Sequence, residues 1–142
     1  MKEALESLGL PPDAVRWLLG VWLTIQTWDD VADGDKIERE DLDRAIFLTM
    51  APIDLFFEAN KAMLLPLMAN AVLKWKASDT IERERMTEHL PKAYMWRAGF
   101  YDVVLQVLAI CKGEDFAMSN AHRVAMIYGE KLEDYMKEFD NA

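Results

Sequence analysis

The chain has only one cysteine, Cys111, among 142 residues, so it can form neither an internal disulfide nor a thiolate zinc site of its own. It has few residues that interrupt secondary structure, with five prolines and six glycines, and no polar repeat typical of a linker or disordered tail. No apolar run reaches the roughly 18 residues that suggest a membrane span, and residues 1–6 lack the basic start and apolar core of a signal peptide. We therefore expect a soluble, cytoplasmic protein, ordered nearly throughout and without a membrane partner.

Basic residues are also scarce, with 16 Lys and Arg against 25 Asp and Glu, which gives a net charge of -9. Nucleic-acid backbones are bound by clustered Lys and Arg, so this charge argues against a nucleic-acid partner. The two histidines, His89 and His122, lack the neighbours of a zinc ligand or a general base, and no glycine-rich phosphate loop is present. A phosphate group could still be held through a metal ion.

What the chain does contain is apolar residues at helical spacing, which make up much of its 52% hydrophobic content. No segment shows the alternation of a half-buried strand or a hairpin signal. We therefore predict an all-α fold, an antiparallel helical bundle of five to six helices, in a single domain spanning 1–142. The expected helices cover residues 12–33, about 38–50, 53–59, 61–77 with Asn60 as N-cap, 79–112 with a kink or break at Pro91, and a final amphipathic helix after Gly113.

The one stretch with a chemistry of its own ends the helix expected over 12–33. Gln26, Asp30 and Asp33 are spaced i, i+4 and i+7, and Asp29 lies at the shoulder of the same face. Carboxylates so placed repel one another, and a hard divalent ion such as Mg²⁺ would relieve that repulsion while bridging to substrate phosphates. The alternative is a solvated helix end closed by Gly34, and the sequence leaves both interpretations open.

A second acidic group belongs to the predicted final helix, where Glu130, Glu133 and Asp134 are spaced to share a face. A charged stripe opposite an apolar one is usually the solvated side of a helix. The other interpretation is a second metal-binding wall that faces the first across a diphosphate.

Two charged residues, Arg97 and Asp102, interrupt an otherwise apolar stretch. Buried charges need partners, so we expect each to contact a group from another helix. For Arg97 the candidates are one of the aspartates at 29, 30 and 33, in a structural salt bridge, or a substrate phosphate.

The segment Gln26-Thr27-Trp28-Asp29-Asp30-Val31-Ala32-Asp33 resembles the aspartate-rich motif of the trans-prenyltransferases, the isoprenoid synthase family. The resemblance implies that Asp29, Asp30 and Asp33 bind Mg²⁺, which in that family holds an allylic diphosphate. The match covers about eight residues. Family members are about twice as long and carry two such motifs, whereas this chain has one. A homodimer could supply the second. The all-α nucleotide pyrophosphohydrolases are closer in size, but their paired acidic motifs are not cleanly reproduced.

From these observations we predict Mg²⁺-dependent binding, with or without turnover, of a diphosphate-containing small molecule. The metal ligands would be Asp29, Asp30 and Asp33, with Gln26 and Arg97 contacting the substrate. The alternative is a non-enzymatic interaction or assembly protein that forms a homo-oligomeric helical bundle. Whether the chain is an enzyme is left open by the sequence.

Overall fold

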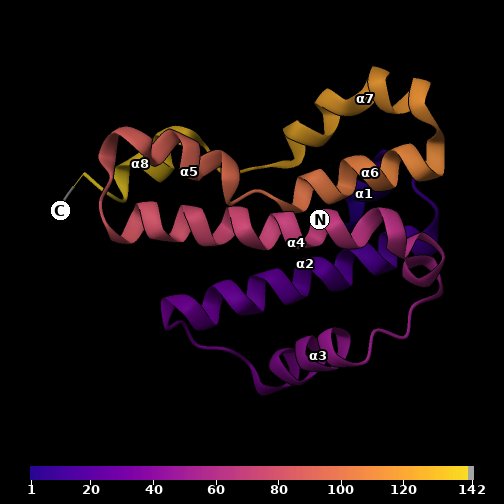
Figure 1. Ribbon diagram of the computed structural model, residues 1–142, viewed down its shortest axis with the longest axis horizontal. Helices are drawn as coiled ribbons and strands as arrows, with labels where there is room; N and C mark the ends of the chain where they lie inside the picture. Colours follow the sequence, from indigo (N-terminus) through magenta and orange to yellow (C-terminus); the bar gives the residue numbers. More distant parts are fainter. Residues whose placement is uncertain (141–142) are drawn as a thin grey trace. The chain divides into compact units, whose positions relative to one another are not determined.

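The computed structural model describes residues 1–140, and in that part of the chain all regular structure is helical, which confirms the all-α prediction (Figure 1). Six α-helices, α2 to α7, have seven or more residues, in agreement with the five to six expected. The elements in order are α1 (Lys2–Ser7), α2 (Pro12–Asp33), α3 (Arg39–Met50), α4 (Leu55–Arg83), a 3₁₀ turn η1 (Thr87–His89), α5 (Leu90–Trp96), α6 (Phe100–Lys112), α7 (Glu114–Ile127) and α8 (Leu132–Lys137).

The chain divides into two compact units, Met1–Lys61 and Ala62–Ala142, and the boundary falls inside α4. A division into compact units describes packing and not independent folding, so the single domain over 1–142 stays a prediction. No helix within residues 1–140 combines the length and apolar character that crossing a membrane requires.

In the first unit, α2 has the bounds predicted for it. Pro12 occupies its first turn, where the missing N–H costs nothing. Its C-terminal end is closed by Gly34 in the left-handed conformation, with φ 77°, which glycine adopts without a steric penalty. The core of this unit includes Trp17, whose ring stacks on Phe57 at 5.4 Å between centroids. Helix α1 was not predicted, and it packs against α2 with Leu5 fully buried.

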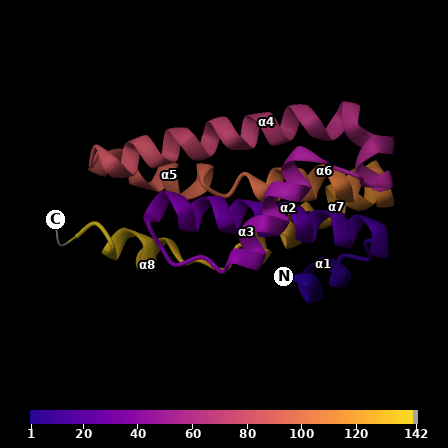
Figure 2. The same cartoon turned by 90° about the horizontal axis from the view of Figure 1, so that it is seen from below.

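Helix α4 corrects the expectation of separate helices over 53–59, 61–77 and from 79 onward, because it runs unbroken for 29 residues through Pro66 (Figures 1 and 2). Asn60 is not a cap, since its amide Nδ2 donates to the Phe56 carbonyl 2.8 Å away within the helix. Asp79, which with Glu82 has the spacing of a capping box, lies inside α4 and does not begin a helix. Its carboxylate accepts from Lys76 Nζ at 3.4 Å and from Arg83 Nε at 3.1 Å, one turn to either side.

In the second unit, the helix expected over 79–112 with a kink or break at Pro91 is also wrong, because α4 ends at Arg83, η1 and α5 follow, and α6 begins only at Phe100. Pro91 lies in the first turn of α5. Arg85, two residues after the end of α4, has φ 52°, which a continuing helix cannot accommodate. The predicted final helix is two helices, α7 and α8, separated by residues 128–131. Helices α6 and α7 meet at Gly113, with φ 89°, and lie side by side (Figure 1).

Candidate functional site

The acidic residues predicted as metal ligands lie in the last part of α2. Asp29 and Asp30 are half-buried, whereas Asp33, the final residue of the helix, is exposed, as is Gln26. The last turn of α2 carries no basic residue. Because the C-terminal end of a helix carries partial negative charge, the carboxylates gain nothing from the helix dipole and need water or a cation nearby.

The predicted Mg²⁺ site is not preformed as a cluster. Within residues 1–140, no group of three or more His, Cys, Asp and Glu side chains is arranged to hold a metal ion. Mg²⁺ needs only one or two protein carboxylates and keeps several waters, so this finding does not test the prediction. The assignment of Asp29, Asp30 and Asp33 as metal ligands therefore stays a prediction.

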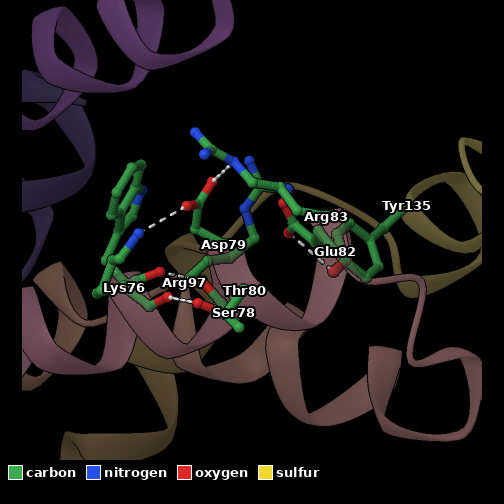
Figure 3. A network of polar contacts seen from close by, with 9 residues as sticks. Lys76, Ser78, Asp79, Thr80, Glu82, Arg83, Arg97 and Tyr135 are labelled. Carbon is green, nitrogen blue, oxygen red and sulfur yellow. Dashed lines mark hydrogen bonds and ion pairs between the residues drawn. The ribbon is translucent and has the colours of Figure 1, made fainter.

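Arg97, predicted to contact substrate, belongs to a polar network in the second unit (Figure 3). It follows α5 and lies half-buried, with Nη1 3.6 Å from Glu82 Oε1 on α4. Its guanidinium carbon lies 5.4 Å from the ring centroid of Tyr135 on α8, a cation–π distance. The Tyr135 hydroxyl donates to the same Glu82 oxygen at 2.9 Å. Glu82 therefore connects α4 both to α8 and to the end of α5.

A second group of contacts fastens residues 128–130 onto α5. The Tyr94 hydroxyl donates to the backbone carbonyl of Glu130. The Tyr128 hydroxyl lies 3.0 Å from the Tyr94 carbonyl oxygen and 3.1 Å from Glu130 Oε2, and it can donate a hydrogen bond to either. The rings of Tyr94 and Tyr128 stack with centroids 4.9 Å apart. The two groups of contacts together attach the chain from Tyr128 to Tyr135 to the helices before it.

The hydroxyls of Tyr128 and Tyr135 are held in their protonated form, because their pKa values are raised. Burial is the largest cause that raises the pKa of Tyr128, and the neighbouring carboxylate of Glu130 raises it further. Burial, followed by the hydrogen bond to Glu82, likewise raises the pKa of Tyr135. Both hydroxyls therefore remain hydrogen-bond donors. Among the described residues, no buried side-chain nitrogen or oxygen lacks a hydrogen-bond partner.

The expectation that Arg97 and Asp102 each contact another helix is confirmed. Arg97 meets Glu82, and Asp102 on α6 accepts from Lys74 Nζ on α4 at 2.8 Å. Both contacts are made to α4, and neither partner could be identified from the sequence. A contact between Arg97 and a substrate phosphate stays a prediction.

The second acidic group is not one helix face, which corrects the expectation for residues 130–134. Glu130 precedes α8 and is half-buried against α5, whereas Glu133 and Asp134 are exposed in the first turn of α8. Lys137 Nζ lies 3.3 Å from Glu133 and 4.0 Å from Asp134. Exposed pairs at this spacing are typical of the solvated side of a helix.

Sequence reasoning missed the tyrosines, although a signal for them was present. The chain has four tyrosines, and all lie between residues 94 and 135, at positions 94, 101, 128 and 135. A residue type with both an apolar ring and a polar hydroxyl, confined to one part of the chain, is typical of a buried hydrogen-bonded cluster.

No protein-family model, curated protein or solved structure matches this chain significantly. The similarity to the trans-prenyltransferases therefore rests on the motif at Gln26–Asp33 alone.

Proposed function

We propose that this chain is a non-enzymatic assembly protein that forms a homo-oligomer. The observation that carries the proposal is an apolar strip on the surface of the first unit, which we call the 46–55 strip. It begins on α3 and continues through the connection to α4. Its five members are large apolar side chains, each more than half exposed: Ile46 at 51%, Phe47 at 56%, Met50 at 79%, Ile53 at 86% and Leu55 at 90%. Contiguous exposed apolar surface typically marks a protein interaction site.

The local sequence explains why the strip faces outward. Helix α3 packs on α2, with Ala45 buried and with Leu48 lying 3.4 Å from where a Cβ on Gly20 would be. At 100° per residue, Phe47 and Met50 fall on the opposite side of α3 from Ala45. The strip is therefore a second apolar face that the first unit does not bury.

The charges near the strip favour a second copy of the chain as the partner. The ion pair between Arg39 Nε and Asp43 Oδ1, at 2.9 Å, lies on the same outer face of α3. In a symmetric dimer the same patch of both subunits forms the interface. A patch edge that carries both a positive and a negative charge can therefore pair with the same edge of a second copy. The one charged residue within the strip, Asp54, is used locally, because its Oδ1 accepts from the Phe57 backbone N–H at 2.8 Å. The strip itself, residues 46–55, thus presents no unpaired carboxylate to a second copy of the chain.

Sedimentation velocity over a wide range of concentrations tests this proposal. The native chain is expected to form oligomers, and the double variant Phe47→Gln/Met50→Gln is expected to be monomeric, with unchanged helix content by circular dichroism. The matched control is Met118→Gln/Met126→Gln, which removes equally exposed apolar residues, at 72% and 76%, from α7. It should associate as the native chain does. A native chain that stays monomeric, or a Phe47/Met50 variant that associates equally, would reject the proposal.

A second candidate function is Mg²⁺-dependent diphosphate binding at the end of α2. It is supported by the three carboxylates within the last five residues of that helix and by the absence of a basic residue from its last turn. A cation bound there would neutralise the oxygens of a diphosphate, with the exposed Gln26 amide one turn earlier as a donor to them. The role of the aspartates would be electrostatic, whether or not a reaction follows.

Thermal unfolding with Mg²⁺ and inorganic pyrophosphate tests the second candidate. A ligand at 100 times its Kd stabilises the folded state by about 2.7 kcal/mol, so the midpoint should rise for the native chain. Asp30→Asn should lose the rise, and the control Asp115→Asn, at an exposed acid in α7, should keep it. If the native chain shows no rise, or Asp30→Asn keeps it in full, the acidic end of α2 is a solvated helix end.

A further inference from the structure

Helix α4 has an exposed apolar face within the second unit, which we call the 62–73 face. At 100° per residue, its members all lie within about 60° of Ala69 around the helix, and all are exposed. They are Ala62, Leu65, Pro66, Ala69, Val72 and Leu73. The largest exposed fraction is that of Leu73, at 69%, whereas Leu64 on the opposite side is completely buried. The 62–73 face is therefore contiguous apolar surface that residues 1–140 leave uncovered.

This face lies in the longest stretch of the chain without an acidic residue. Residues 59–78 contain three lysines and no aspartate or glutamate, although acidic residues outnumber basic ones by 25 to 16 in the whole chain. The next carboxylate along α4, that of Asp79, is largely buried and is shared by Lys76 Nζ at 3.4 Å and Arg83 Nε at 3.1 Å (Figure 3). Both cationic side chains are exposed. The apolar face thus continues into a positively charged one toward the end of the helix.

The 46–55 strip has the opposite charge beside it. Residues 38–44, which lead into the strip along α3, contain four acidic and two basic residues. The exposed ion pair between Arg39 and Asp43 belongs to this segment. Two strips opposed to one another would bring two such acidic segments together, which costs free energy. The 62–73 face offers apolar surface of the same kind with cations at its end, so it is the better electrostatic match.

An antiparallel arrangement of α3 on α4 aligns the apolar and the charged parts at the same time. Both helices rise about 1.5 Å per residue, so the numbers of residues that lie level with one another have a constant sum. Setting Phe47 level with Val72 also sets two further pairs level, Met50 with Ala69 and Asp43 with Lys76. A parallel arrangement would instead set Asp43 level with Met68, where it meets no opposite charge.

We propose that the 46–55 strip of one copy binds the 62–73 face of a second copy, with α3 antiparallel to α4. This inference rests on the homo-oligomer proposed above and names the surface that the strip meets. The contact joins two different surfaces, so it closes into a two-fold dimer where it is made twice, and it otherwise continues into larger assemblies. In both cases each copy supplies one of the two surfaces to its neighbour.

Mixing two association-defective variants tests this pairing by sedimentation velocity. Phe47→Gln/Met50→Gln loses the strip and keeps the 62–73 face, whereas Val72→Gln/Leu73→Gln loses the face and keeps the strip. Each variant alone should be monomeric, and an equimolar mixture should form a dimer with one copy of each. The control Met63→Gln changes a residue of α4 that is 49% exposed but lies about 120° around the helix from Ala69. It should associate as the native chain does, and circular dichroism checks that helix content is unchanged in every variant.

The outcomes separate this inference from the assembly on which it rests. A native chain that stays monomeric rejects both. If the native chain associates and the Val72/Leu73 variant associates equally, the strip meets another surface, such as a second strip, and this inference alone is overturned. A mixture of the two variants that stays monomeric overturns it as well.

Exchanging two charges tests the antiparallel arrangement. Asp43→Lys and Lys76→Glu should each weaken association by about two- to fivefold, because each sets like charges against one another at an exposed pair. Both changes in one chain should restore association, since opposite charges are again level with one another. A double variant that associates no better than the two single variants overturns the antiparallel arrangement.

Discussion

Replacing Tyr135 with alanine is expected to destabilise the protein by about 3–5 kcal/mol, the range measured for large aromatic residues truncated in a core. Tyr135 is completely buried and forms a core cluster with Leu90 and Ala93 of α5. Its ring also lies 5.1 Å from that of Phe139 and beneath the guanidinium of Arg97. Truncation would remove all of these contacts together, and urea unfolding measures the loss.

The variant Tyr135→Phe separates the contribution of ring packing to stability from the contribution of the hydroxyl hydrogen bond. It keeps the ring and loses the hydrogen bond to Glu82, and a bond to a charged acceptor contributes about 1.5–3 kcal/mol. We therefore expect a smaller loss of stability than for Tyr135→Ala. Equal losses for the two variants would show that the hydroxyl network, and not the packed ring, holds α8 in place. A negligible loss for both would contradict the placement of α8 on α5.

Gly99→Ala is expected to cost about 1–3 kcal/mol because no space exists for the added methyl group. A Cβ at this position would lie 2.8 Å from the Ala71 Cβ and 3.0 Å from its Cα. The backbone at Gly99 has φ -60° and ψ -21°, which any residue adopts, so the cost would come from contact with α4 and not from backbone strain. Chemical denaturation of the single variant measures it.

The source of that cost can be checked with a double-mutant cycle. Ala71→Gly alone should cost about 1 kcal/mol, because glycine is unfavourable within a helix. In the double variant Gly99→Ala/Ala71→Gly, one methyl group is removed at residue 71 and one is added at residue 99. The stability loss of the double variant should therefore be smaller than the sum of the two single losses. The control is Gly129→Ala, where the nearest atom, the Ile127 carbonyl oxygen, is 3.9 Å away, and it should be close to neutral. Additive losses in the double variant would contradict the close approach.

Where local signals mark both ends of a helix, the sequence was sufficient to predict the bounds of that helix. For α2, Pro12 favours a first helical turn and Gly34 favours the left-handed residue that follows a last turn, and both lie where predicted. The all-α class followed in the same way, from apolar residues at helical spacing in every segment.

Local signals for helix ends were misleading in α4, because the same residues and spacings also occur inside a helix. Asn60 was expected to cap a new helix, yet inside α4 its amide donates to the Phe56 carbonyl, and Pro66, which lies within the helix expected over 61–77, leaves α4 unbroken. Asp79 and Glu82 have the spacing of a capping box, which is also the ordinary i, i+3 spacing of a helix interior. Only Arg85, in the left-handed conformation, marks the true end, and arginine gives no sequence signal for it.

For the candidate sites, the sequence predicted which residues need a partner but not which residues those partners are. That Arg97 and Asp102 need partners follows from their apolar surroundings, but Glu82 and Lys74 are brought to them by tertiary packing across 15 and 28 residues of sequence. The sequence predicted that a helix ends at about residue 50, which lies within the 46–55 strip. The exposure of the strip depends on which face of α3 packs against α2, and periodicity alone does not reveal this.

The position of the unit boundary inside α4 determines how the chain can be divided in the laboratory. A cut after Lys61 would leave the first fragment with only Leu55–Lys61 of the helix, although Phe56 and Phe57 in that piece form its contacts with Trp17. Seven residues are too few to be helical without support. The second fragment would begin in mid-helix, with backbone N–H groups stripped of their carbonyl partners. Expression of either half therefore requires an overlap that includes most of α4.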